Sequence, residues 1–165
     1  MAKTMCTIAA RSLVLCATVT ALIVMILDNE TVDIGGTFTL EAKYTDWGSL
    51  KYFVIANGVT GCYTFLVLLL PSGSLLWKLV AALDAIITII IATGGTAGAT
   101  IAYLMKNGNP SVIGWQPYCN LVPTYCNHIM GALAACCIGA LLQFLLTMHT
   151  FHVVINPLLV KQELN

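Results

Sequence analysis

The chain has 165 residues, of which 59% are hydrophobic and 8% are charged, with no formal net charge at pH 7. An ordinary soluble domain carries about 25% charged residues, so this composition excludes a typical soluble protein and indicates a membrane protein. The balanced charge also offers no basic patch of the kind that binds nucleic acid or acidic lipid surfaces.

Four apolar segments are long enough to cross a membrane, because a helical span needs about 20 residues. They cover about residues 4–27, 50–70, 76–104 and 129–155. We therefore expect an all-α membrane protein, with one transmembrane domain over residues 1–165 that forms a four-helix up-down bundle. Two short loops, a shorter link and a tail remain, which leaves no room for a separate catalytic domain.

The first span has one alternative interpretation, a cleavable signal peptide. Lys3 and Arg11 would be its charged region and SLVLCATVTALIVMIL its apolar region. That run is longer than the usual apolar region of about 7–15 residues, and no A-x-A-like cleavage site follows it. We therefore expect a retained span.

Basic residues predict the orientation of the spans. Lys3 and Arg11 flank the first span at its start, Lys78 lies by the link between the second and third spans, and Lys161 follows the fourth. Lysine and arginine near short loops favour the cytoplasmic side. We therefore expect a multi-pass protein with both termini in the cytoplasm and two short extracellular loops.

The first loop contains a sequon for N-glycosylation, Asn29-Glu30-Thr31. Since this loop is expected on the outer side, Asn29 is a possible glycosylation site. It follows the first span closely, which works against its modification.

A single carboxylate, Asp84, lies in the third span within LVAALDAIITIII, residues 79–91. An isolated charge near mid-membrane costs roughly 2.5–3.5 kcal/mol on insertion scales. Counting residues from the outer ends of the spans places Arg11 and Asp84 both in the cytoplasmic third. We therefore predict an intramembrane ion pair between Arg11 and Asp84, because a planar guanidinium suits a carboxylate with two parallel hydrogen bonds.

Two alternatives to this ion pair remain open. Arg11 could extend along its own stem to the cytoplasm, with Asp84 satisfied by hydroxyls or water. Asp84 could also carry a proton or cation in a transporter or channel, since ionisable residues in spans often mark transport pathways. The chain has no second acid in its spans and no inverted repeat, so the structural pair is preferred.

Small residues recur at helical spacing in the third and fourth spans, where they let membrane helices approach closely. Their spacing serves contacts within one bundle and contacts between copies equally well, and we expect contacts within the bundle for most of them. The predicted packing or oligomerisation positions are Gly94, Gly95, Gly98, Gly131, Ala135 and Gly139.

The second loop, GWQPYCNLVPTYCNH, contains Cys119 and Cys126. On the oxidising outer side this pair predicts a disulfide. A zinc site is the alternative, but His128 alone does not supply the missing second pair of ligands. Trp115 of the same loop is expected at the outer membrane interface.

Residues that carry chemistry in enzymes are scarce. His149 and His152 share a helical face, but no carboxylate or cysteine joins them there, so we interpret them as interface histidines. No phosphate loop, serine nucleophile elbow or pair of catalytic carboxylates is present. We therefore expect no enzymatic activity, no metal and no cofactor.

The sequence resembles the plant Casparian strip membrane domain protein family, in particular its CASP-like members, which are related to the MARVEL tetraspans. The matching residues touch all four spans. They are Arg11, KYFVIANGVTGCY at 51–63, Asp84 and YLMKNGNPSVIGWQPYCNLVPTYC at 103–126. An Arg in the first span with an Asp in the third is the family's pattern, so the resemblance and the depth argument select the same two residues.

The resemblance implies a plasma-membrane tetraspan, surrounded by membrane lipids, that associates with itself and with related family members. It also implies a role in organising a membrane domain next to the cell wall. The first outer loop, TVDIGGTFTLEAKYTDWGSL, differs from that of the members that build the Casparian strip. A barrier role in the endodermis is therefore not implied.

Overall fold

The computed structural model describes residues 5–34, 38–70, 77–108 and 117–162. Within these ranges, four helices are long and apolar enough to cross a membrane. They are α1 (Met5–Leu27), α2 (Gly48–Leu69), α3 (Trp77–Asn107) and α4 (Pro123–Gln162). The expected all-α membrane fold with four spanning helices is confirmed.

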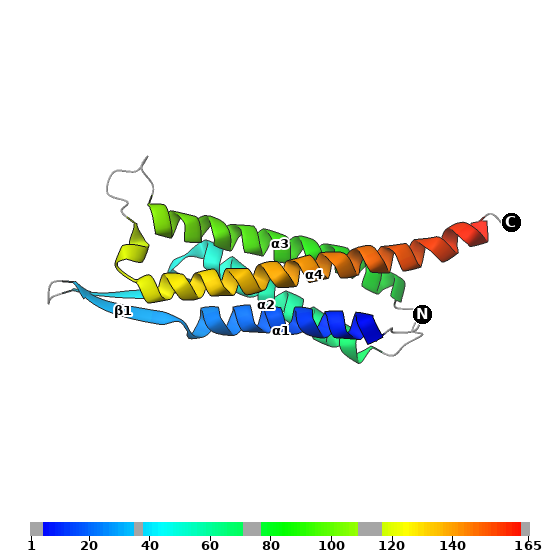
Figure 1. Ribbon diagram of the computed structural model, residues 1–165, viewed down its shortest axis with the longest axis horizontal. Coiled ribbons are helices and arrows are strands. Elements are labelled where there is room, and N and C mark those ends of the chain that lie inside the picture. The colour runs from blue at the N-terminus through cyan, green and yellow to red at the C-terminus, as the bar shows by residue number, and fades with distance from the viewer. Residues whose placement is uncertain (1–4, 35–37, 71–76, 109–116, 163–165) are drawn as a thin grey trace.

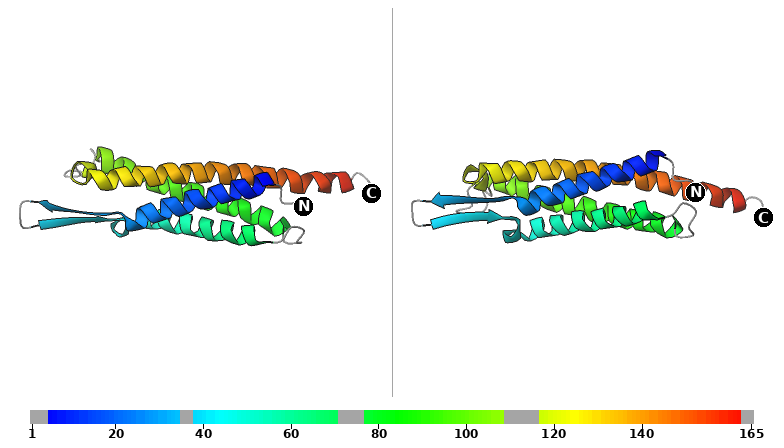
Figure 2. Two further views of the ribbon diagram at one scale, coloured as in Figure 1. Left: turned by 60° about the horizontal axis from the view of Figure 1, so that its bottom comes forward. Right: turned by 90° about the horizontal axis from the view of Figure 1, so that it is seen from below.

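The four helices alternate in direction and lie side by side in an elongated bundle (Figures 1 and 2). α1 begins and α4 ends at one end of the bundle, here called the termini end. α1 packs against α2 and α4, and α3 packs against the same two helices. As a result, α1 and α3 face each other across the diagonal of the bundle.

Three helix boundaries differ most from the predicted ones, and one of them is the end of α4, at Gln162 rather than near residue 155. α4 begins at Pro123 rather than near residue 129, because proline fits the first turn of a helix, where its missing N–H would have no helical partner. α3 extends past residue 104 to Asn107. It is closed by Gly108, whose φ of 70° suits glycine and whose N–H donates to the Leu104 carbonyl over 2.8 Å.

The first loop contains a β-hairpin that the sequence analysis did not predict. Strands β1 (Asn29–Ile34) and β2 (Phe38–Lys43) are antiparallel, with Asn29 opposite Lys43 and Ile34 opposite Phe38. The hairpin extends beyond the helices along the long axis of the bundle, and this end is called the hairpin end (Figures 1 and 2). Two sequence signals were available: the alternation of apolar and polar residues in FTLEAK, and the Gly-Gly pair between the strands.

The two halves of the bundle are filled differently. The main apolar core lies toward the hairpin end and includes Met25, Phe53, Ile91 and Tyr125. The half toward the termini end contains buried polar side chains, which are Arg11, Thr64, Asp84, Gln143 and Thr147. Each of the four helices contributes at least one of these buried polar side chains.

Glycines on α3 allow close contact with its neighbours. A Cβ atom at Gly94 would lie 2.5 Å from the Cβ of Ala56, and one at Gly98 would lie 2.9 Å from Phe53 Cδ2 and 3.0 Å from Leu133 Cδ2. The approaches to Ala56 and Phe53 are shorter than real Cβ contacts, and the one to Leu133 is tighter than most of them. Gly94 and Gly98 therefore serve packing within a single chain.

The remaining predicted packing positions divide between the interior and the surface. Gly139 of α4 approaches Ala17 of α1, and a Cβ there would meet the Cβ of Ala17 at 3.4 Å. Gly95 is half-buried beside Cys136, and Ala135 is a half-buried neighbour of the apolar core. Gly131 is exposed, with space for a Cβ atom free of neighbours within 4 Å.

Candidate functional site

Arg11 and Asp84 meet inside the bundle. Arg11 Nη1 donates to Asp84 Oδ1 over 3.1 Å, and Arg11 Nη2 donates to Asp84 Oδ2 over 2.7 Å. Arg11 is 4% exposed and Asp84 is 0% exposed. Because α1 and α3 lie on the diagonal, the long arginine side chain crosses the centre of the bundle to form this two-pronged ion pair.

The other two helices also contribute to the Asp84 carboxylate. The Tyr63 hydroxyl of α2 donates to Oδ1 over 2.7 Å, and Gln143 Nε2 of α4 lies 3.3 Å from the same oxygen. The Thr150 hydroxyl of α4 lies 3.4 Å from Oδ2. All four spans therefore supply a side chain to one polar cluster, which is formed by Arg11, Tyr63, Asp84, Thr88, Gln143, Thr147 and Thr150.

Two threonines extend the polar cluster along α3 and α4. The Thr88 hydroxyl donates to the Asp84 carbonyl over 2.7 Å, and the Thr147 hydroxyl lies 3.3 Å from the same carbonyl. The two hydroxyls are 2.8 Å apart. These contacts join α3 to α4 at the level of the ion pair.

The cluster explains how a charge is tolerated in a membrane span. Both carboxylate oxygens accept hydrogen bonds from a neutralising guanidinium and from uncharged donors, which offsets the cost of removing the pair from water. Within the polar cluster, Gln143 Oε1 is buried without a hydrogen-bond partner among the described residues. The arrangement fixes the carboxylate in place and surrounds it with protein.

The sequence predicts the charged pair but not its neutral partners. Gln143, Thr147 and Thr150 are spaced four and three residues apart, which puts them on one face of α4. Polar residues at that spacing in an apolar span were a usable signal. Tyr63 gave no comparable pattern, because its role depends on how α2 packs against α3.

A second set of contacts lies at the hairpin end. Cys119 and Cys126 form a disulfide with their Cα atoms 5.7 Å apart, which confirms the predicted bond. It ties the short 3-10 turn η2 (Tyr118–Asn120) to the first turn of α4. The cysteines therefore hold the second loop close to the start of the fourth span.

The hairpin is docked on the start of α4 by two acids. Glu30 of β1 accepts a hydrogen bond from the Tyr125 N–H over 2.7 Å, and Asp28 Oδ1 lies 2.7 Å from His128 Nδ1. The first N–H groups of a helix have no helical acceptor, and a carboxylate satisfies one of them and complements the helix dipole. Glu30 thus caps α4 from a distant part of the chain.

An aromatic contact links the two loops. The rings of Trp47 and Tyr118 meet edge to face, with centroids 6.0 Å apart. Burial, with a further contribution from the negative charge of Asp46, raises the pKa of Tyr118 above its ordinary value. The Tyr118 hydroxyl is accordingly held in its neutral form at this contact.

The other predicted site residues occupy separate places. Asn29 is exposed at the first position of β1, and its glycosylation stays a prediction. Trp115 lies outside the described residues. Within the ranges that the structure describes, no group of three or more His, Cys, Asp or Glu side chains could hold a metal ion.

Known proteins are similar to this chain over most of its length. The family model of the Casparian strip membrane protein domain matches residues 1–142. CASP-like protein 1C1 of Arabidopsis thaliana is 43% identical over 147 residues, which cover 89% of this chain and 88% of the relative. CASP-like protein 1C2 of Populus trichocarpa is 44% identical over 148 residues, which cover 88% of both chains. CASP-like protein 1C1 of Vitis vinifera is 36% identical over 155 residues, which cover 94% and 96%. No solved structure matches the chain.

Proposed function

The chain belongs to the Casparian strip membrane protein domain family, and we propose that it is a non-enzymatic scaffold of the plasma membrane. In this proposal it associates with copies of itself and with related family members, and it organises a membrane domain next to the cell wall. The observation that carries the proposal is the polar cluster around Asp84 of α3, whose carboxylate is bonded by side chains of the three other helices.

The geometry of Asp84 favours a structural role over ion transport. A carboxylate that carries ions must exchange its partners and reach water, whereas Asp84 is 0% exposed and is neutralised by Arg11. The two hollows described between α3 and α4 lie at the hairpin end, away from the cluster. The cluster therefore supports a role in setting how the four spans meet.

A rigid bundle suits a scaffold because its helices keep the same outward faces, so a partner always meets the same surface. Large apolar side chains cover the outward faces of the helices, including Leu13, Ile55, Ile89 and Leu141. In a membrane such faces contact either lipid or another span. Gly131 adds a position on α4 where another backbone can approach closely, since no atom fills the space beside it.

The proposed orientation puts the hairpin end outside and both termini in the cytoplasm. The Cys119–Cys126 disulfide at the hairpin end is of the kind that persists on the oxidising side of a membrane. The basic residues predicted to face the cytoplasm include Arg11, near the start of α1. The hairpin and the disulfide-linked turn would then face the wall.

The test of self-association uses two differently tagged copies expressed together in plant cells. We expect the two copies to co-purify in mild detergent and native mass spectrometry to show more than one chain per particle. A strictly monomeric protein that also diffuses freely after photobleaching at the plasma membrane would contradict the scaffold. An unrelated four-span protein with the same tags serves as the control.

A separate measurement addresses transport. Purified protein in liposomes is expected to give no proton or potassium flux above that of empty liposomes. A flux abolished by Asp84→Asn in protein that keeps its fold would replace the scaffold with a transporter.

A further inference from the structure

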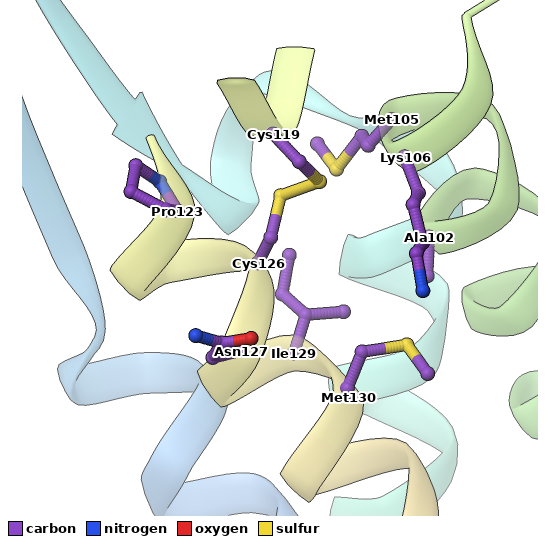
Figure 3. A pocket seen from close by; sticks show the side chains of 9 residues that line it. All are labelled: Ala102, Met105, Lys106, Cys119, Pro123, Cys126, Asn127, Ile129 and Met130. Atoms are coloured by element: carbon purple, nitrogen blue, oxygen red, sulfur yellow. A yellow bond between two sulfur atoms is a disulfide. The ribbon is translucent and has the colours of Figure 1, made fainter. Parts of the chain in front are cut away.

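A groove runs between α3 and α4 at the hairpin end. It consists of two adjoining hollows of about 140 Å³ and 580 Å³. Ala102, Lys106 and Met130 line both of them. Figure 3 shows these side chains and the Cys119–Cys126 disulfide, which lines the smaller hollow. The total volume lies in the range of about 300–1,000 Å³ that is typical of ligand pockets.

The groove exists because the side chains between α3 and α4 are short in this part of the bundle and leave space unfilled. On one side of this space the two helices touch closely, where Gly98 meets Leu133. Beside that contact, Ala99 and Ala102 of α3 and Ala134 of α4 line a space that their short side chains do not fill. Since this space lies within the spanning parts of both helices, it opens onto the lipid of the membrane.

One charged side chain lies in this apolar groove. Lys106 is exposed and makes no hydrogen bond or ion pair with any residue that the structure describes. Its side chain extends along the groove past Ala102 toward Met130 (Figure 3). Among the described residues, no Asp or Glu lines either hollow. The groove therefore combines a mainly apolar lining with one positive charge, that of Lys106, which has no partner among the described residues.

We propose that this groove binds one anionic glycerophospholipid. An acyl chain lies between α3 and α4 along Ala99, Ala134 and Cys137, and the phosphate meets the Lys106 ammonium. Lysine is a common phosphate ligand, and Lys106 supplies the positive charge among the described residues that line this groove. A zwitterionic lipid brings its own cation and leaves the lysine less well matched. The site needs only that the helices cross a membrane, so it does not depend on self-association.

A second copy of the chain fits the groove less well. Asp84 is the only Asp or Glu in the four spans, and it is already bonded to Arg11. A neighbouring span would therefore offer Lys106 no carboxylate in the membrane. A phospholipid supplies both the anion and the apolar chain in one molecule.

The test measures retained lipid. The protein is reconstituted in nanodiscs of equal parts phosphatidylglycerol and phosphatidylcholine. It is then released in mild detergent, and native mass spectrometry measures the mass of the protein with its bound lipids. We expect about one retained phosphatidylglycerol per chain. Lys106→Gln should reduce its retention about fivefold, which is the effect of one lysine near an anionic membrane surface. Ala134→Phe should also reduce it, by filling the groove.

Two matched variants serve as controls. Lys51→Gln removes an exposed lysine at the same end of the bundle outside the groove, and Ala92→Phe enlarges an exposed alanine of α3 outside it. Both should retain lipid as the unmodified protein does, and all four variants should keep their helical circular dichroism. Equal retention of both lipids by the unmodified protein, or an equal loss with Lys51→Gln, overturns the proposal. So does an Ala134→Phe variant that loses a second copy instead of a lipid.

Discussion

The guanidinium of Arg11 and the carboxylate of Asp84 join two helices that are not neighbours in the bundle. α1 and α3 each pack on α2 and α4, and the paired side chains cross the diagonal between them with Nη2 and Oδ2 2.7 Å apart. Tyr63 and Gln143 then bring the remaining helices to the same carboxylate. One carboxylate thus fixes the relative depth of all four spans.

Removing one member of the pair should destabilise the bundle strongly. Asp84→Asn leaves the Arg11 charge buried without its partner, and Arg11→Gln does the same to Asp84. Breaking a buried pair in this way costs about 3–5 kcal/mol. The double variant Arg11→Gln with Asp84→Asn should lose less than the sum of the two single changes, as measured by thermal unfolding in detergent. Strictly additive losses would show that the two side chains do not depend on each other.

Tyr63→Phe should also lower stability, by about 1.5–3 kcal/mol, because it removes a hydrogen bond to a charged acceptor. Tyr52→Phe is the matched control. Its hydroxyl contacts the Thr93 hydroxyl at an exposed position, so its removal should cost less. Equal midpoints of unfolding for the two variants would contradict a special role for Tyr63.

Gly94→Ala should destabilise by about 1–3 kcal/mol, since its new methyl group would lie 2.5 Å from the Cβ of Ala56 and would force α2 and α3 apart. Gly131→Ala faces open space and should leave the fold intact, with a gain of up to about 1 kcal/mol from helix propensity. The thermal midpoints of the two variants measure the difference. A tolerated Gly94→Ala would mean that the two helices can separate at little cost.

Loss of the disulfide should loosen the hairpin end. Replacement of Cys119 and Cys126 by serine is expected to cost about 2–4 kcal/mol, whereas Cys137→Ser, at an exposed position on α4, should have little effect. After reduction in intact cells, a membrane-impermeant thiol reagent should label Cys119 and Cys126. Labelling only after the cells are opened would place this end of the bundle in the cytoplasm.

Glu30→Gln should weaken the contact between the hairpin and α4, because a neutral amide is a poorer acceptor for the Tyr125 N–H at the positive end of a helix. We expect faster hydrogen exchange in the first turn of α4. Glu41→Gln is the control: Glu41 pairs with Lys43 on the surface, where ion pairs contribute about 0–1 kcal/mol. The same exchange rates in both variants would remove Glu30 from this role.

The sequence was sufficient for the spans and for the charged pair, because both follow from simple constraints. Twenty apolar residues in a row have one stable environment, and a buried Asp84 needs a cation at its own depth. The neutral partners of Asp84 follow from a weaker constraint. Tyr63 and Gln143 are ordinary residues in a span until the rotation of each helix is known, and that rotation comes from packing of the whole bundle.

The hairpin and the groove were missed for different reasons. β1 and β2 are short and partly charged, and their pairing depends on the turn between them more than on hydrophobicity. The groove is a space between α3 and α4 that short side chains leave unfilled. Lys106 indicates a binding site only once that space is known to lie beside it. The small residues that predicted close packing at Gly94 and Gly98 also left the hollow at Ala99 and Ala134.

The position of the ion pair also bears on how the chain is made. Arg11 precedes Asp84 by 73 residues, so α1 enters the membrane during synthesis with a charge that has no partner until α3 arrives. An arginine inside a span weighs against its insertion, so α1 is less stable in the membrane before its partner arrives. The first helix is therefore fully stabilised in the membrane only when the third helix supplies Asp84. A chain truncated before Asp84 would leave Arg11 without a partner and open to recognition by cellular quality control.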